Sequence, residues 1–68
     1  MARRSILLLV DEAMALLEQV EKALGDLAAE SRDGSVSPGT VYRAYTGLVR
    51  LHEKLAEIRE AAYRAGMA

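Results

Sequence analysis

The sequence contains no cysteine, tryptophan or phenylalanine, and it has a single proline and a single histidine. Without cysteine, the chain has neither a disulfide framework nor a thiolate metal site. Three tyrosines are its only aromatic residues, which disfavours a β core. Alanine, leucine, glutamate and arginine dominate instead, and that mixture is typical of packed helices. The composition therefore predicts an all-α protein.

A long apolar run is also missing. The segment "RRSILLLVDEAMALL", residues 3–17, begins like a targeting sequence, but Asp11 and Glu12 interrupt it directly after Val10. A secretory signal needs about 7–15 apolar residues and a cleavage site, and a spanning helix needs about 20. We therefore expect neither in this chain, and we expect a cytoplasmic location.

The one strong interruption inside the chain is "SRDGSVSPGT", residues 31–40. Gly34 can adopt the left-handed conformation that ends a helix. Ser37 is a good N-cap, and Pro38 follows at the first helical position, where its missing N–H costs nothing. Ser5 is the corresponding N-cap near the start of the chain.

These signals predict a single domain, residues 1–68, with a helix over about 6–32, a loop over 33–37 and a second helix over about 38–65. Each helix would be about 40 Å long at 1.5 Å per residue. Helices of equal length joined by a short loop form an antiparallel hairpin.

Apolar residues recur at heptad spacing in both segments. If Val10 is counted as position a, every a and d site between residues 6 and 27 is apolar, and the same holds between residues 41 and 65. This period predicts a left-handed, coiled-coil-like bundle. The predicted helix-packing interface is Ile6, Val10, Ala13, Leu17, Val20, Leu24, Leu27, Val41, Ala44, Leu48, Leu51, Leu55, Ile58 and Ala62.

Both segments remain apolar beyond a and d. The flanking apolar residues are Leu7, Leu9, Met14 and Leu16 in the first segment and Tyr42, Tyr45, Val49, Ala56 and Tyr63 in the second. Such faces are too broad for two helices to cover alone. We expect two hairpins to dimerise into a four-helix bundle, or another helical protein to supply the missing helices.

The two predicted helices carry opposite charge. Residues 6–31 contain six acidic residues and one lysine, a net charge of −5, whereas residues 38–65 contain five basic and three acidic residues, a net charge of +2. Opposite signs favour contacts of the first helix with the second over contacts between like helices.

Few residues are suited to catalysis. His52 has no carboxylate three residues before it, so the Glu-x-x-His spacing of metal sites in helical bundles is absent. The serines lie at predicted helix ends, where capping explains them, and "GSVSPGT" lacks the lysine of a phosphate-binding loop. We expect no catalytic residue, no metal and no cofactor, and hence no enzyme.

The sequence favours a small helical-hairpin protein that acts by helix–helix association, as a homo-oligomeric adaptor or regulator, or as a docking subunit of a larger assembly. The alternative is a nucleic-acid-binding regulator, because arginine and tyrosine alternate in the second helix. The residues that would bind RNA or DNA are Tyr42, Arg43, Tyr45, Arg50 and Arg64. The net charge of −1 argues against a dedicated nucleic-acid binder.

A docking patch for a partner is also predicted at the end of the hairpin where the chain termini meet. Leu8 falls at the outward f position there, and its neighbours fill the flanks. The apolar candidates are Leu7, Leu8, Leu9, Tyr63 and Met67, with Arg3, Arg4 and Arg64 as a basic rim. An apolar centre with a polar rim is typical of a protein interface. The same first turn also resembles a short membrane-surface anchor.

Overall fold

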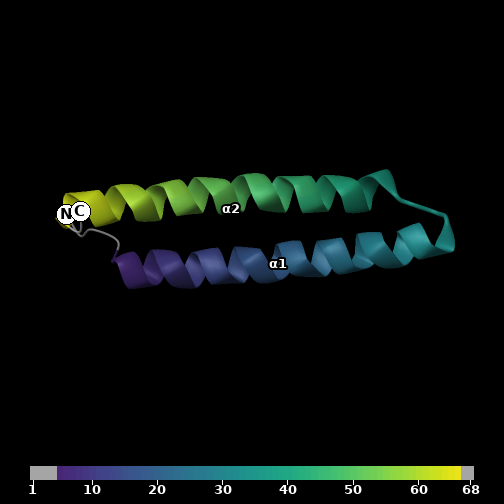
Figure 1. Cartoon of the computed structure of the whole chain (residues 1–68), viewed down its shortest axis with the longest axis horizontal. Helices are drawn as coiled ribbons and strands as arrows, with labels where there is room; N and C mark the ends of the chain where they lie inside the picture. Colours follow the sequence, from purple (N-terminus) through teal and green to yellow (C-terminus); the bar gives the residue numbers. More distant parts are fainter. Residues whose placement is uncertain (1–4, 67–68) are drawn as a thin grey trace.

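The computed structural model describes residues 5–66, which form two helices packed against each other. Helix α1 is Ile6–Asp33 and helix α2 is Pro38–Arg64. The helices run antiparallel, with the connection at one end and the start of α1 and the end of α2 at the other (Figure 1). The molecule measures 49 × 22 × 14 Å. The predicted all-helical class and the pairing of two helices are confirmed.

Helix α1 begins and ends at residues with clear capping roles. The Ser5 hydroxyl accepts a hydrogen bond of 3.0 Å from the backbone N–H of Leu8. At the other end, Gly34 has φ 77° and ψ 18°, and its N–H donates to the carbonyls of Glu30 and Ser31. A side chain is disfavoured in this left-handed conformation, so glycine is the natural residue for the position.

Helix α2 begins at a cluster of polar groups around Glu30. The Ser37 hydroxyl caps α2 by accepting from the N–H of Gly39 at 3.2 Å. The Ser37 N–H donates to one Glu30 carboxylate oxygen at 2.7 Å, and the Thr40 hydroxyl donates to the other at 2.5 Å. The carboxylate of Glu30, near the end of α1, thus accepts hydrogen bonds from the start of α2 and holds its first turn in place.

These hydrogen bonds also change the acidity of Glu30. The Thr40 hydroxyl, then the Ser37 N–H and the nearby Arg43 guanidinium, hold the pKa of the Glu30 carboxyl below its ordinary value, against the opposing effects of partial burial and Asp26. The ionised form is therefore the one that the loop and the start of α2 stabilise.

Within one chain the helices meet along positions d and g, which we call the inner seam. Every described d residue from Ile6 to Ile58 is buried or half-buried. The other half of the seam is g, not a. The g residues are also buried or half-buried, and they are Leu9, Leu16, Ala23, Glu30, Thr40, Gly47, Lys54 and Ala61.

Small side chains explain why d and g form the seam. Ala13, Ala23 and Ala44 are buried there, and a methyl group built on Gly47 would lie 2.9 Å from Cγ2 of Val20. The backbones approach closely where these residues meet, because little lies between them.

Polar contacts run along the flank of the seam formed by position c. The guanidinium of Arg43 lies 3.5 Å from a carboxylate oxygen of Asp26. The ammonium of Lys54 lies 3.0 Å from Glu12 and 3.1 Å from Glu57, and its side chain is only 16% exposed. Such ion pairs add modest stability and help to set the register of the two helices.

Candidate functional site

The broad exposed apolar surface of the hairpin lies at positions a and e. Five a residues that were predicted to lie in the helix interface are exposed in the single chain: Val10, Leu24, Val41, Leu48 and Leu55. Leu17 and Ala62 are half-buried, and the e residues Leu7, Met14 and Tyr45 are exposed beside them. We call these ten residues the a/e face.

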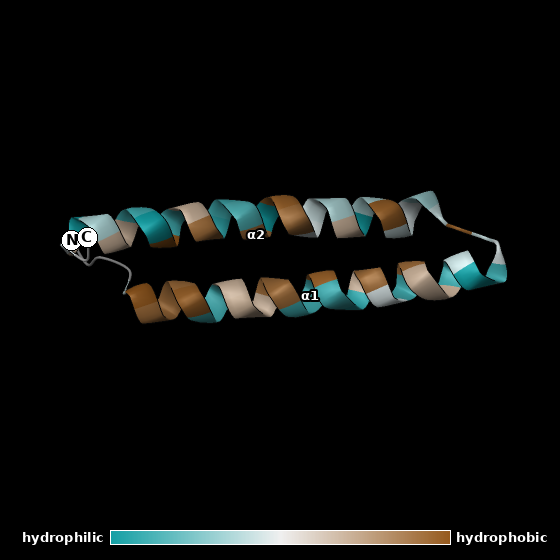
Figure 2. Cartoon of the chain, in the orientation of Figure 1, coloured by the Kyte–Doolittle hydropathy of each residue, from teal (hydrophilic) through white to brown (hydrophobic). Residues whose placement is uncertain are grey.

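Both helices turn this face to the same side of the hairpin. Around a helix the order of positions is c, g, d, a, e, so the seam at g and d has c on one flank and a on the other. The c residues Asp26 and Arg43 contact each other across the helices, which places both c flanks on one side. Because the helices are antiparallel, both a flanks lie on the opposite side. Brown, apolar segments recur along α1 and α2 in Figure 2.

The hairpin exposes more surface than a compact protein of its size. Its accessible surface is 5250 Å², whereas a compact monomer of 7.4 kDa would expose about 4200 Å². This excess of about 1000 Å², taken over all 68 residues, is of the same order as one partner's share of a standard protein interface, about 800 Å². No described side chain falls below 2% exposure, so a single hairpin has no fully dry core.

Three polar residues stand among the apolar ones on this surface. Glu21 is an e residue of α1, and His52 and Arg59 are e residues of α2, and all three are exposed. Val49 and Tyr63 extend the surface at its outer edge, position b of α2. The face thus has a carboxylate on one helix and two basic side chains on the other. This arrangement can determine the orientation in which a partner binds.

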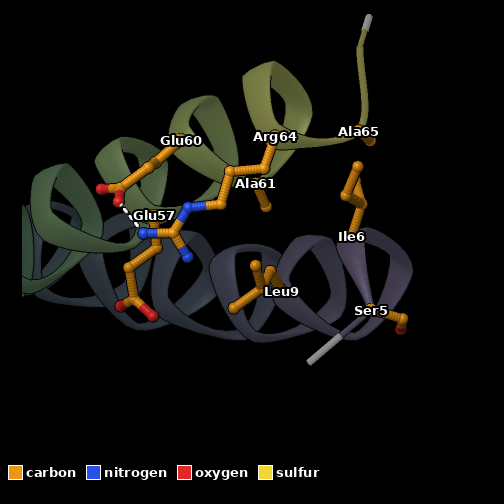
Figure 3. A pocket seen from close by; sticks show the side chains of 8 residues that line it. All are labelled: Ser5, Ile6, Leu9, Glu57, Glu60, Ala61, Arg64 and Ala65. Carbon is orange, nitrogen blue, oxygen red and sulfur yellow. Dashed lines mark hydrogen bonds and ion pairs between the residues drawn. The ribbon is translucent and has the colours of Figure 1, made fainter. Parts of the chain in front are cut away.

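The predicted docking patch at the open end is only partly assembled. Leu7, Leu8 and Tyr63 are exposed, but Leu9 is 3% exposed because its g position faces α2. Met67 lies outside the described residues. Beside Leu9 is a hollow of about 520 Å³ (Figure 3). It is lined by Ser5, Ile6, Leu9, Glu57, Glu60, Ala61, Arg64 and Ala65, and the Arg64 guanidinium pairs with Glu60.

The residues considered for nucleic-acid binding do not form one surface. Tyr42, Arg43 and Arg50 line a shallow hollow with Lys22 on the c flank. Arg43 is paired there with Asp26. Tyr45 belongs to the a/e face, and Arg64 lies at the far end of α2, where it pairs with Glu60. The predicted ridge of alternating arginine and tyrosine is therefore divided between different sides of the helix.

Among residues 5–66, no group of three or more His, Asp or Glu side chains is placed to hold a metal ion. Over the same residues, neither helix has the length and hydropathy needed to cross a membrane.

Sequence reasoning missed the role of position g in the inner seam. A usable signal was present: alanine and glycine recur at d and g, as Ala13, Ala23, Ala44, Gly47 and Ala61, and small residues are typical of closely approaching helices. The a/d pattern alone cannot separate the contacts within one hairpin from those with a second one, since both use the same apolar stripe.

Comparison of the chain with protein-family models, curated proteins and solved structures found no significant match.

Proposed function

We propose that the protein acts by self-association: two hairpins pair through their a/e faces into a four-helix bundle, and the homodimer serves as a non-enzymatic adaptor or regulator. The observation that carries the proposal is the exposure of five heptad a residues on one side of the hairpin. In a stable helical bundle such residues are interior ones.

The area supports a second copy as the occupant of this face. The excess surface of about 1000 Å² per chain would become about 2000 Å² in a dimer, which is at the upper end of standard interfaces. Charge supports it as well, because the a/e face carries the carboxylate Glu21 on α1 and the basic residue Arg59 on α2. A second copy offers each helix a partner of opposite sign.

The inner seam by itself is a weak source of stability. Its buried residues are Leu9, Ala13, Val20, Ala23, Thr40 and Ala44, of which three are alanines. A short chain without disulfides or metals commonly gains the rest of its core by oligomerising. Folding and association would then be coupled, so that the hairpin is most stable as a dimer.

The proposal is tested by the concentration dependence of thermal unfolding. Dimerisation stabilises the folded state by mass action, so the melting temperature should rise when the chain concentration is increased 100-fold. A melting temperature independent of concentration, together with a cooperative transition, would contradict the proposal. A chain that is unfolded at every concentration and folds only with another protein would show that a different helical partner covers the face.

A further inference from the structure

Two copies can bring their a/e faces together in two symmetric ways. A two-fold axis along the helices places both loops at the same end, with α1 of each copy against α2 of the other. A two-fold axis across the helices places the loops at opposite ends, with α1 against α1 and α2 against α2. Both arrangements make every facing pair antiparallel, so the apolar pattern alone does not choose between them.

Relative heights along the hairpin fix which residues would meet. Val20 lies level with Gly47, and Asp26 lies level with Arg43. Glu21 therefore lies at a height between Tyr45 and His52, the two e residues of α2 on either side of Gly47. An axis along the helices keeps these heights unchanged in the partner.

The charges on the facing helices favour one arrangement. With loops at the same end, the carboxylates on or beside the a/e face of α1, Glu21 at e and Asp11 and Glu18 at b, face an α2 that carries Arg59 at e. With loops at opposite ends, the carboxylates of Glu21, Asp11 and Glu18 on one α1 face those on the other α1. Like-charge contacts of this kind act against an arrangement even where opposite-charge contacts add little affinity.

The position of Glu21 distinguishes the two arrangements at a single residue. It lies within two residues of the midpoint of α1, Ile6–Asp33, so opposite-end pairing would place the two Glu21 residues within about 5 Å of each other along the bundle axis. Same-end pairing places Glu21 between the partner's Tyr45 and the partner's His52. Both side chains can donate a hydrogen bond to the carboxylate.

We propose that the dimer has both loops at the same end, with α1 of each copy packed against α2 of its partner and Glu21 held between Tyr45 and His52. This inference rests on the proposed self-association. The hollow beside Leu9 lies on the c flank, with Glu57 and Arg64, so the two hollows would be at the same end of the bundle but on its two opposite outer faces.

Spin-label distances test the arrangement directly. The chain has no cysteine, so Ser35→Cys in the exposed loop gives a single labelling site. Helix axes in bundles lie about 8–10 Å apart, so same-end loops should give a label–label distance below about 25 Å. Opposite-end loops should give about 45 Å, close to the 49 Å length of the hairpin.

The matched control is Ala65→Cys at the other end of the hairpin. Same-end pairing also gives a short distance for this variant. A mixture of chains labelled at 35 and at 65 adds a long distance, which comes from the mixed dimers. A dimer whose Ser35→Cys label pair lies about 45 Å apart would overturn the arrangement and leave self-association intact. A labelled chain that remains monomeric by mass would remove both proposals.

A charge exchange gives a second test. His52→Glu places a carboxylate beside the partner's Glu21 and should raise the dissociation constant at least tenfold, and adding Glu21→Lys should restore most of the affinity. Failure of the double variant to recover, with both variants still helical, would show that these residues do not face each other.

Discussion

Truncation of Leu48 measures how much the a/e face contributes to association. Leu48 is an a residue near the middle of α2 and is 48% exposed in the single chain. Complete burial of a leucine side chain contributes about 1.5–3 kcal/mol. Association would bury the exposed half, so each copy loses about 1 kcal/mol when Leu48→Ala removes most of the side chain.

Both copies of a symmetric dimer carry the change, so the loss is about 2 kcal/mol per dimer, which corresponds to an approximately 30-fold rise in the dissociation constant. Sedimentation equilibrium at several loading concentrations would measure this constant. The cavity left in the interface would increase the effect.

Leu8→Ala is the matched control. Leu8 is the same residue type and is 47% exposed, but its f position points away from both the inner seam and the a/e face. Leu8→Ala should leave the dissociation constant within a factor of two of the wild type. Equal effects of the two substitutions, or a larger effect at Leu8, would refute the assignment of the a/e face as the association surface.

Three further predictions concern the hairpin itself. Gly25→Ala, which meets open space, should stabilise α1 by about 1 kcal/mol. The free energy of unfolding of the Gly47→Ala variant, measured in urea, should be about 1–3 kcal/mol lower than that of the Gly25→Ala variant, because the added methyl group overpacks the inner seam. Equal free energies for the two variants would refute the close approach of the helices at Gly47. The Glu30 pKa is lowered from 4.5, so its stabilisation is present above that pH and is lost as the pH falls through the lower folded value. The melting-temperature gap between wild type and Glu30→Gln should therefore narrow in acid, and a constant gap would contradict this. Lys54→Met removes an ammonium shared by two carboxylates and should cost about 1 kcal/mol; an unchanged urea midpoint would show that these ion pairs contribute nothing.

Local features of the fold were predictable because local chemistry determines them. Ser5, Gly34 and Ser37 each have a conformational or hydrogen-bonding role that depends on a few neighbouring residues, and the structure places them at the helix ends where that role is met. The antiparallel pairing follows from helix length and from the short loop. No long-range information was needed for these steps.

The choice of seam was not predictable from heptad periodicity. Positions a and g both flank d, and the pattern does not say which of them faces the neighbour in the same chain. The close contact of Gly47 with Val20 depends on side-chain volumes on two helices at once. The apolar a residues, which the heptad pattern had placed between the two helices of one hairpin, are therefore exposed and available for contact with a second protein chain.

The mass of the purified chain in solution tests the central claim most directly. Sedimentation equilibrium at micromolar concentration should give twice the chain mass of 7.4 kDa, with helical content preserved by circular dichroism. A well-folded species with the mass of one chain at that concentration would contradict the account, because the a/e face would then be stable in water without a partner.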